Sequence, residues 1–242
     1  MNLAIDVGNT IVKAAVFHQN NLIEVVVFPE EKIISEIKLL KKKYAFNDAI
    51  ISSVASISEK KLEKLQKNLT LLKVSSAIKT PFNNLYKTPK TLGADRISLV
   101  TAANKSFPNQ NVLVIDAGTC ITFDFIDKNN DYFGGAISLG IEMRFKALHK
   151  FTKKLPLLEK NLLDNLIGQN TQESINSGVV NGVIQEIDGV IEQYKKKYQN
   201  LTIVLTGGDT NFLSKQLKSS IFANQNFLLE GLNELLIFNK NK

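Results

Sequence analysis

The sequence predicts a duplicated α/β fold with a cleft between its two halves. Three observations predict it: strand-like runs are followed by helix-like runs, the opening pattern returns 110 residues later, and a turn-forming stretch at 107–111 precedes the second copy. Alternating strands and helices are typical of α/β layers, and a long internal repeat indicates two copies of one unit. We therefore expect a first domain at residues 1–108 and a second at 109–242.

The first domain begins with strands. Residues 3–17 contain two β-rich runs separated by a Gly-Asn turn, and residues 22–28 form a third. Pro29 then opens a helix whose apolar positions recur at three- and four-residue spacing: Ile33, Ile37, Leu40 and Tyr44. Residues 49–54 are predicted to form a strand and residues 58–69 a helix.

The second domain repeats the opening. Asp116 and Gly118 stand where Asp6 and Gly8 stood, each pair follows a strand-like run, and residues 131–137 match the third run. The alternative is a chance similarity between two apolar strands that both end in Asp-x-Gly. After Ser138 the chain is predicted to be helical through Asn200. A buried strand at 201–205 follows and ends in the turn Thr206-Gly207-Gly208-Asp209.

The composition excludes several classes of protein. With 242 residues, 44% apolar and 22% charged, the chain is typical of globular proteins and unlike disordered or collagen-like ones. No apolar stretch approaches the roughly 18 to 20 residues of a membrane helix, and Asp6 falls where a signal peptide would be apolar. We expect a cytoplasmic chain without a membrane partner. The net charge of +7 suits an anionic substrate, but only two of the 30 basic residues are arginines, so no nucleic-acid partner is expected.

Familiar catalytic motifs are absent. The sequence has no Walker phosphate loop, no Gly-x-Gly-x-x-Gly, no His-Glu-x-x-His, no Gly-x-Ser-x-Gly and no Cys-x-x-Cys. With two histidines and one cysteine, a multi-histidine or cysteine metal site is excluded.

Two Asp-x-Gly turns remain as candidate phosphate sites. Glycine lets backbone N–H groups approach phosphate oxygens, and the hydroxyls of Thr10 and Thr119 add donors. An aspartate beside phosphate requires a cation between them, which makes Asp6 and Asp116 candidate metal-side residues. Lys13 can act as a point charge on the phosphates. Ordinary hairpin turns are the alternative for either motif taken singly.

The segment Gly93-Ala94-Asp95-Arg96 precedes a helix-like run at 97–104. In a phosphotransferase a carboxylate aligns the acceptor hydroxyl and accepts its proton, and a neighbouring arginine can hold substrate oxygens. A helix-dipole contact with a surface ion pair is the alternative.

Taken in order, these motifs resemble the type III pantothenate kinases of the acetate and sugar kinase, Hsp70 and actin superfamily. The resemblance spans nearly the whole chain and implies duplicated actin-like ATPase domains of the ribonuclease H-like kind. In one departure, Leu139-Gly140 stands where the family usually has Pro-Gly. The motifs that carry the resemblance are Asp6-x-Gly8-Asn9-Thr10-x-x-Lys13, Gly93-x-Asp95-Arg96, Asp116-x-Gly118-Thr119, Gly134-Gly135-x-Ile137, Asn170-Thr171 and Thr206-Gly207-Gly208-Asp209.

The resemblance also implies an activity: ATP-dependent phosphorylation of pantothenate to 4′-phosphopantothenate, the first step towards coenzyme A, by a homodimer. Asp95 would be the general base, Asp116 would ligate a monovalent cation (K⁺ or NH₄⁺), and Asp6 would lie on the Mg²⁺ side. The implied ATP-binding residues are Asp6, Val7, Gly8, Asn9, Thr10, Ile11, Val12, Lys13 and Thr119. The implied pantothenate-binding residues are Tyr86, Gly93, Ala94, Asp95, Arg96 and Thr171.

Two other functions remain open. A superfamily relative that phosphorylates another small alcohol, such as a sugar, would keep both Asp-x-Gly turns and differ in the acceptor pocket. A non-catalytic regulatory or accessory relative would show erosion of the acidic residues, whereas Asp6, Asp95 and Asp116 are all present.

Overall fold

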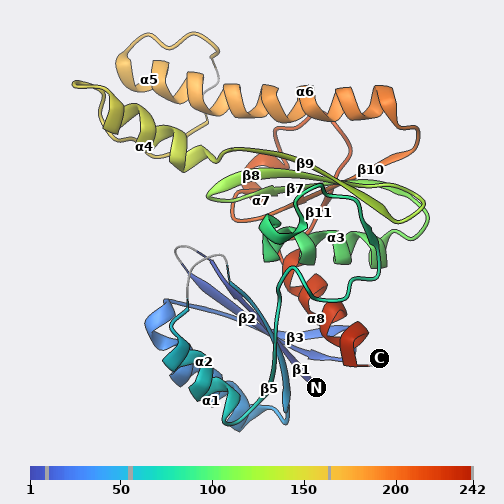
Figure 1. Cartoon of the computed structure of the whole chain (residues 1–242). Helices are drawn as coiled ribbons and strands as arrows, with labels where there is room; N and C mark the ends of the chain where they lie inside the picture. Colours follow the sequence, from blue (N-terminus) through green and yellow to red (C-terminus); the bar gives the residue numbers. More distant parts are fainter. Residues whose placement is uncertain (9–10, 54–56, 163–164, 241–242) are drawn as a thin grey trace. The chain divides into compact units, whose positions relative to one another are not determined.

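The computed structural model describes residues 1–8, 11–53, 57–162 and 165–240 (Figure 1). By their contacts the residues form two compact units. Unit 1 comprises residues 1–109, 126–133 and 226–242, and unit 2 comprises residues 110–125 and 134–225. The chain thus returns twice to unit 1 after its main segment ends. The domain division at residues 108 and 109 stays a prediction of the sequence repeat.

Unit 1 is built on a five-stranded sheet with the order β3-β2-β1-β4-β5. β1 is antiparallel to β2 and parallel to β4, and β4 is parallel to β5. Because side chains alternate along a strand, the odd-numbered residues of β1 face one side, where they form a core with α1 and α2. The bounds are β1 Asn2–Val7, β2 Val12–His18, β3 Asn21–Phe28, β4 Asp48–Ser53, β5 Thr70–Lys73, α1 Ile33–Lys43 and α2 Glu59–Gln66.

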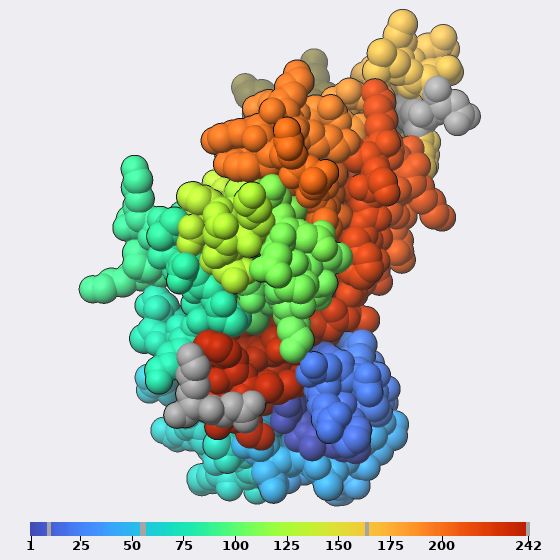
Figure 2. Space-filling view, turned by 90° about the vertical axis from the view of Figure 1, so that its right-hand side faces the viewer, coloured from blue at the N-terminus to red at the C-terminus, as the bar shows by residue number. Residues whose placement is uncertain are grey.

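The other face of this sheet is covered by α3 (Ala94–Ser106) and α8 (Phe227–Lys240). The two helices approach closely at Gly231, where a Cβ atom would lie 1.9 Å from the carbonyl oxygen of Ser98. α8 also contacts β1, and the side chain of Asn2 donates to that of Asn233 over 2.9 Å. Figures 1 and 2 both show the red α8 beside the blue N-terminal strands. Neither α8 nor β5 was predicted from the sequence.

Unit 2 repeats the topology of unit 1. The strands β11-β10-β7-β8-β9 follow one another in an order that matches β5-β4-β1-β2-β3. β6 pairs with the first residues of β9, Asp131 and Tyr132, which like β6 itself belong to unit 1. As β1 is parallel to β4, β7 is parallel to β10. The predicted duplication of an α/β unit is therefore confirmed. The bounds are β6 Asn83–Asn84, β7 Asn111–Ala117, β8 Cys120–Ile126, β9 Asp131–Leu139, β10 Leu201–Thr206 and β11 Phe222–Ala223.

The helices of unit 2 are α4 (Ile141–Phe151), α5 (Thr171–Asn176), α6 (Gly182–Lys197) and α7 (Thr210–Leu213). A π-helical turn joins α5 to α6, and α6 lies along one face of the sheet (Figure 1). The helix predicted from Ser138 to Asn200 was wrong at residues 152–170, where no helix forms in the part that the structure describes. Pro156 explains part of the break because it lacks an N–H and disfavours helical geometry in the preceding residue.

The helix predicted from Pro29 is confirmed, although it starts with the 3₁₀ turn Glu30–Lys32 before α1 begins. A second 3₁₀ turn, Pro89–Thr91, leads towards α3. Over the described ranges, no helix combines the length and apolar character needed to cross a membrane.

Candidate active site

Asp6 lies one residue before the end of β1. Lys13 on β2 and Ser52 on β4 are its direct neighbours in the register of the sheet. Asp6 alternates with the core residues Ile5 and Val7, so its side chain points to the face that α3 and α8 cover. The carboxylate thus shares a face with a helix that begins far along the chain.

Asp95 is the second residue of that helix, α3. Its Oδ1 accepts a hydrogen bond from the backbone N–H of Arg96 over 2.8 Å, so the carboxylate turns back over the start of the helix. A Cβ atom on Gly93 would lie only 2.2 Å from that oxygen. Glycine at position 93 therefore leaves the space that the Asp95 carboxylate occupies.

The carboxylates of Asp6 and Asp95 interact electrostatically. The pKa of Asp6 rises from 3.8 to about 6, first because the carboxyl is buried and second because the charge of Asp95 lies nearby. Lys13 and the Ser52 hydroxyl lower this pKa but do not offset the rise. A like charge raises a pKa in this way only at short range. The structure therefore brings together three of the predicted site residues: Asp6, Lys13 and Asp95.

An aromatic stack lies beside the start of α3. The guanidinium of Arg96, itself buried, lies 5.5 Å from the centre of the Tyr86 ring. Tyr86 stacks on Tyr132 with a centroid distance of 6.4 Å and an interplanar angle of 23°. Phe82 packs edge-on against Tyr132, which is fully buried. The predicted residues Tyr86 and Arg96 thus meet.

Tyr132 was not predicted as a site residue. Its only signal was an aromatic residue in a predicted strand, which is common in sheets.

The first predicted phosphate segment is described on either side of residues 9 and 10. The N–H of Gly8 donates to the carbonyl of Ile11 over 3.1 Å. Val7 and Val12 are fully buried in the core of unit 1, so only their backbone groups can face a ligand, whereas Ile11 is exposed. Asn9 and Thr10, which were predicted to contact ATP, lie outside the described residues.

Unit 2 carries the second cluster. Asp116 pairs in register with Thr206 at the end of β10, as Asp6 does with Ser52. Gly207 has a φ of +95°, and a Cβ atom there would lie 2.4 Å from Oδ1 of Asp116 and 2.3 Å from the carbonyl of Ala117. Only glycine suits this position, because other residues rarely adopt a positive φ. The turn after β10 is therefore held directly against Asp116.

Two more contacts support this cluster. The N–H of Asp209 donates to the carbonyl of Ala117 over 2.9 Å, and its carboxylate pairs with Lys160. Lys160 was not predicted as a site residue, because no motif surrounds it in the sequence. Thr119, predicted to contact ATP, is exposed in the turn between β7 and β8.

The remaining predicted residues are placed as follows. Ala94 begins α3 in unit 1, and Thr171 begins α5 in unit 2. Thr171 is exposed and follows Asn170, whose side-chain oxygen caps the helix by accepting from the N–H of Glu173 over 3.0 Å.

Metal ligands are sparse in the described ranges, where no three His, Cys, Asp or Glu residues gather into one group. A cation here would need one or two carboxylates, backbone carbonyls, water and phosphate oxygens, which is the oxygen shell that Mg²⁺ prefers.

A cavity of about 250 Å³ lies elsewhere, between α1 and α2. Apolar residues and four lysines line it, and none of the predicted site residues does.

Comparisons with known proteins identify the family of this chain. Residues 2–193 match the model of the family described as type III pantothenate kinase. The chain is 51% identical to the type III pantothenate kinase of Christiangramia forsetii over 99% of both chains. It is 47% identical to that of Flavobacterium johnsoniae over 97% of this chain and 96% of the relative.

Solved structures show the same fold at low sequence identity. A Baf family transcriptional activator from Campylobacter jejuni aligns with a TM-score of 0.66 and 22% identity over 99% of this chain and 100% of that one. A glucokinase from an Antarctic psychrotroph aligns with a TM-score of 0.52 and 13% identity over 98% of each chain. Together with the repeated strand order, these likenesses identify duplicated actin-like α/β domains. From the full-length sequence matches, the chain belongs to the type III pantothenate kinase family.

Proposed function

We propose that this protein is a pantothenate kinase that transfers the γ-phosphoryl group of ATP to the primary hydroxyl of pantothenate. Family membership supports the reaction class. The observation that carries the proposal is the electrostatic coupling of Asp6 and Asp95, which come from distant segments and share one face of the sheet. A phosphoryl-transfer site needs both a carboxylate on the phosphate side and one for the acceptor.

Asp95 is the general base of the proposed reaction. The pantothenate hydroxyl gives its proton to the Asp95 carboxylate while its oxygen bonds to the γ-phosphorus in line with the departing ADP oxygen. The bond between the γ-phosphorus and the β–γ bridging oxygen breaks, and ADP leaves with that oxygen. The contact between the Asp95 carboxylate and the Arg96 N–H holds the base in place at the start of α3.

Arg96 and Tyr86 form the acceptor side of the proposal. A guanidinium binds a carboxylate through paired hydrogen bonds, and pantothenate carries one carboxylate. The Tyr86 ring packs against that guanidinium and is backed by the buried Tyr132. Rigid support of this kind keeps the acceptor hydroxyl at a constant distance from the base.

The phosphates are assigned to the segment from Asp6 to Lys13 and to the Gly118–Thr119 turn, where the Thr119 side chain is exposed. The pKa of Asp6 is raised chiefly by burial and then by the charge of Asp95, and Lys13 and the Ser52 hydroxyl do not offset the rise. The Asp6 carboxylate together with phosphate oxygens and water would suit Mg²⁺. When bound, Mg²⁺ would neutralise phosphate charge. Asp116 is the proposed residue for K⁺ or NH₄⁺.

The proposal includes a homodimer in which Thr171 reaches the acceptor site near the subunit interface. Light scattering coupled to size-exclusion chromatography measures the mass directly. A monomeric mass together with full activity would exclude the dimer as a requirement.

The decisive experiment measures ADP release with pantothenate and Mg·ATP, with and without K⁺. We expect ADP release that requires pantothenate and increases with K⁺. Asp95→Asn should lower kcat by about 10²- to 10⁴-fold, the typical contribution of a general base, while binding of the non-hydrolysable analogue AMP-PNP persists. Asp48→Asn, which removes an exposed ion pair with Lys240, is the control and should keep full activity.

ADP release with a hexose instead of pantothenate would favour the superfamily alternative. No release with any acceptor would favour a non-catalytic protein.

A further inference from the structure

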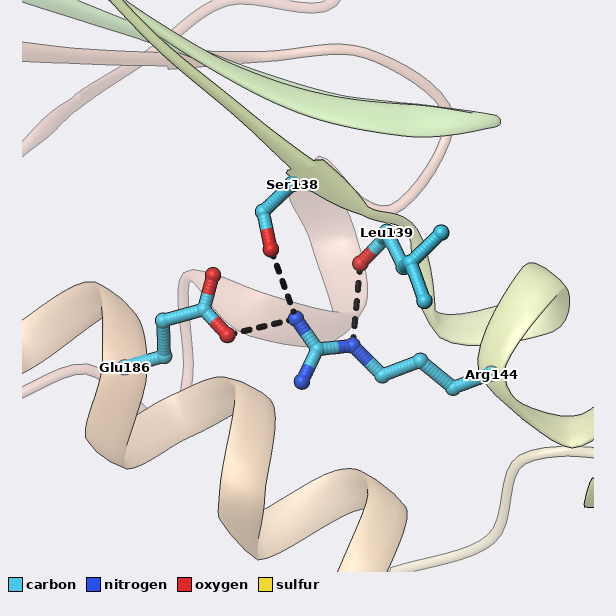
Figure 3. Close-up of polar contacts among 4 residues, drawn as sticks. All are labelled: Ser138, Leu139, Arg144 and Glu186. Atoms are coloured by element: carbon cyan, nitrogen blue, oxygen red, sulfur yellow. Dashed lines mark hydrogen bonds and ion pairs between the residues drawn. The ribbon is translucent and has the colours of Figure 1, made fainter. Parts of the chain in front are cut away.

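The side chain of Arg144 holds the end of β9 in place. Its Nε donates to the carbonyl of Leu139 over 2.9 Å, and its Nη2 donates to Oγ of Ser138 over 3.1 Å (Figure 3). The same Nη2 forms an ion pair with Oε2 of Glu186 on α6 over 2.5 Å. Both charged side chains are largely shielded from solvent, with 21% and 29% of their surface exposed.

The backbone of Arg144 acts on the same segment. Its N–H donates to the carbonyl of Gly140 over 3.1 Å, the first helical hydrogen bond of α4. Residues 138–140 therefore lie between the backbone and the guanidinium of one arginine. A proline at position 139 would fix its own φ through its ring, whereas leucine does not. The conformation of the junction between β9 and α4 therefore depends on non-covalent contacts such as those of Arg144.

Gly140, which directly follows β9, contacts the Gly118–Thr119 turn directly. The N–H of Gly140 donates to the carbonyl of Thr119 over 3.0 Å. A Cβ atom on Gly140 would lie 2.1 Å from the carbonyl oxygen of Gly118 and 2.4 Å from that of Thr119. The two backbones are therefore in direct contact, and a shift of the β9 end would displace the turn or break its hydrogen bond.

We propose that Arg144 is a positioning residue for nucleotide binding. It acts through Gly140 on the Gly118–Thr119 turn. The inference rests on the proposed function only in taking that turn as a phosphate site. If the ion pair with Glu186 were its only role, any cationic side chain at position 144 would be sufficient. The two additional contacts to the strand end use the planar guanidinium fork, which lysine lacks.

Nucleotide binding is the direct test. Titration calorimetry with AMP-PNP and Mg²⁺ should show affinity about tenfold weaker for Arg144→Met, the loss expected for one charge-assisted contact. The KM for ATP should rise by a similar factor while the KM for pantothenate stays unchanged. Arg144→Lys keeps a charge opposite Glu186 and should recover only a minor part of the affinity.

The control is Lys146→Met, which removes an exposed ion pair with Glu142 on the same helix. It should bind AMP-PNP as the unaltered protein does. Ser138→Ala removes only the hydroxyl contact, so it tests the inference even if Arg144→Met fails to fold, and it should weaken AMP-PNP binding without lowering the unfolding temperature.

Three results would overturn the inference: wild-type AMP-PNP affinity in folded Arg144→Met, full recovery in Arg144→Lys, or wild-type affinity in Ser138→Ala. Because AMP-PNP binding requires no pantothenate, the proposed reaction can fail separately. Nucleotide binding that depends on Arg144, in a protein that phosphorylates no pantothenate, would refute the assignment as a pantothenate kinase and support the positioning role.

Discussion

Replacing Asp6 by asparagine should stabilise the protein and inactivate it. The pKa of Asp6 is about 6 in the folded chain, against 3.8 for an unperturbed aspartate. The folded state therefore holds this proton more tightly than the unfolded state. The contribution of Asp6 to the free energy of unfolding is greatest below about pH 4, where the carboxyl is protonated. This contribution falls as the pH rises to about 6 and stays low above that.

The size of the effect follows from the same values. A rise from 3.8 to about 6 corresponds to at most about 3 kcal/mol, at about 1.4 kcal/mol per pKa unit. Asp6→Asn removes the charge and should raise the free energy of unfolding by up to that amount at about pH 8, and by nearly nothing at about pH 4. At about 2–4 °C per kcal/mol for a chain of this size, the melting temperature should rise by several degrees.

The assay is urea and thermal unfolding at both pH values, with EDTA present so that no divalent cation occupies the site. Glu24→Gln is the matched control in the same sheet, because the hydrogen bond from Lys43 lowers the pKa of Glu24 instead of raising it. This variant should not gain stability at about pH 8. Equal unfolding free energies for the unaltered protein and Asp6→Asn at about pH 8 would refute the reasoning.

Three further predictions concern close backbone contacts and the aromatic stack. Gly207→Ala should destabilise the protein by about 1–3 kcal/mol or more in urea unfolding, whereas Gly208→Ala, with no atom near its Cβ position, should be tolerated. Gly140→Ala should weaken AMP-PNP binding in calorimetry, and Gly189→Ala, in open space on α6, should not. Tyr132→Ala should lower the free energy of unfolding by about 3–5 kcal/mol and raise the KM for pantothenate. Tyr132→Phe retains the ring contact with Tyr86 and should keep a near-normal KM. Equal KM values for the two variants would contradict a supporting role for this ring.

The sequence by itself determined the duplicated α/β architecture and the candidate acidic residues. Strand alternation, helical spacing and glycine turns are local properties of the chain, so the strands and helices at residues 3–69 and the equivalence of Asp6 and Asp116 could be predicted from it. The predicted helix was wrong at the described residues between 152 and 170, because the helical patterns on either side outweighed the signal of Pro156.

Tertiary structure alone decided which side chains meet. Asp6 interacts with Asp95, and Tyr86 stacks on Tyr132, only because elements far apart in the sequence pack together. The hydrogen bonds from Arg144 to Ser138 and Leu139 depend on how α4 packs against the end of β9. The position of α8 is likewise set by its packing against α3 and the five-stranded sheet. Burial and like-charge proximity set a pKa, and neither exists until distant segments fold against one another.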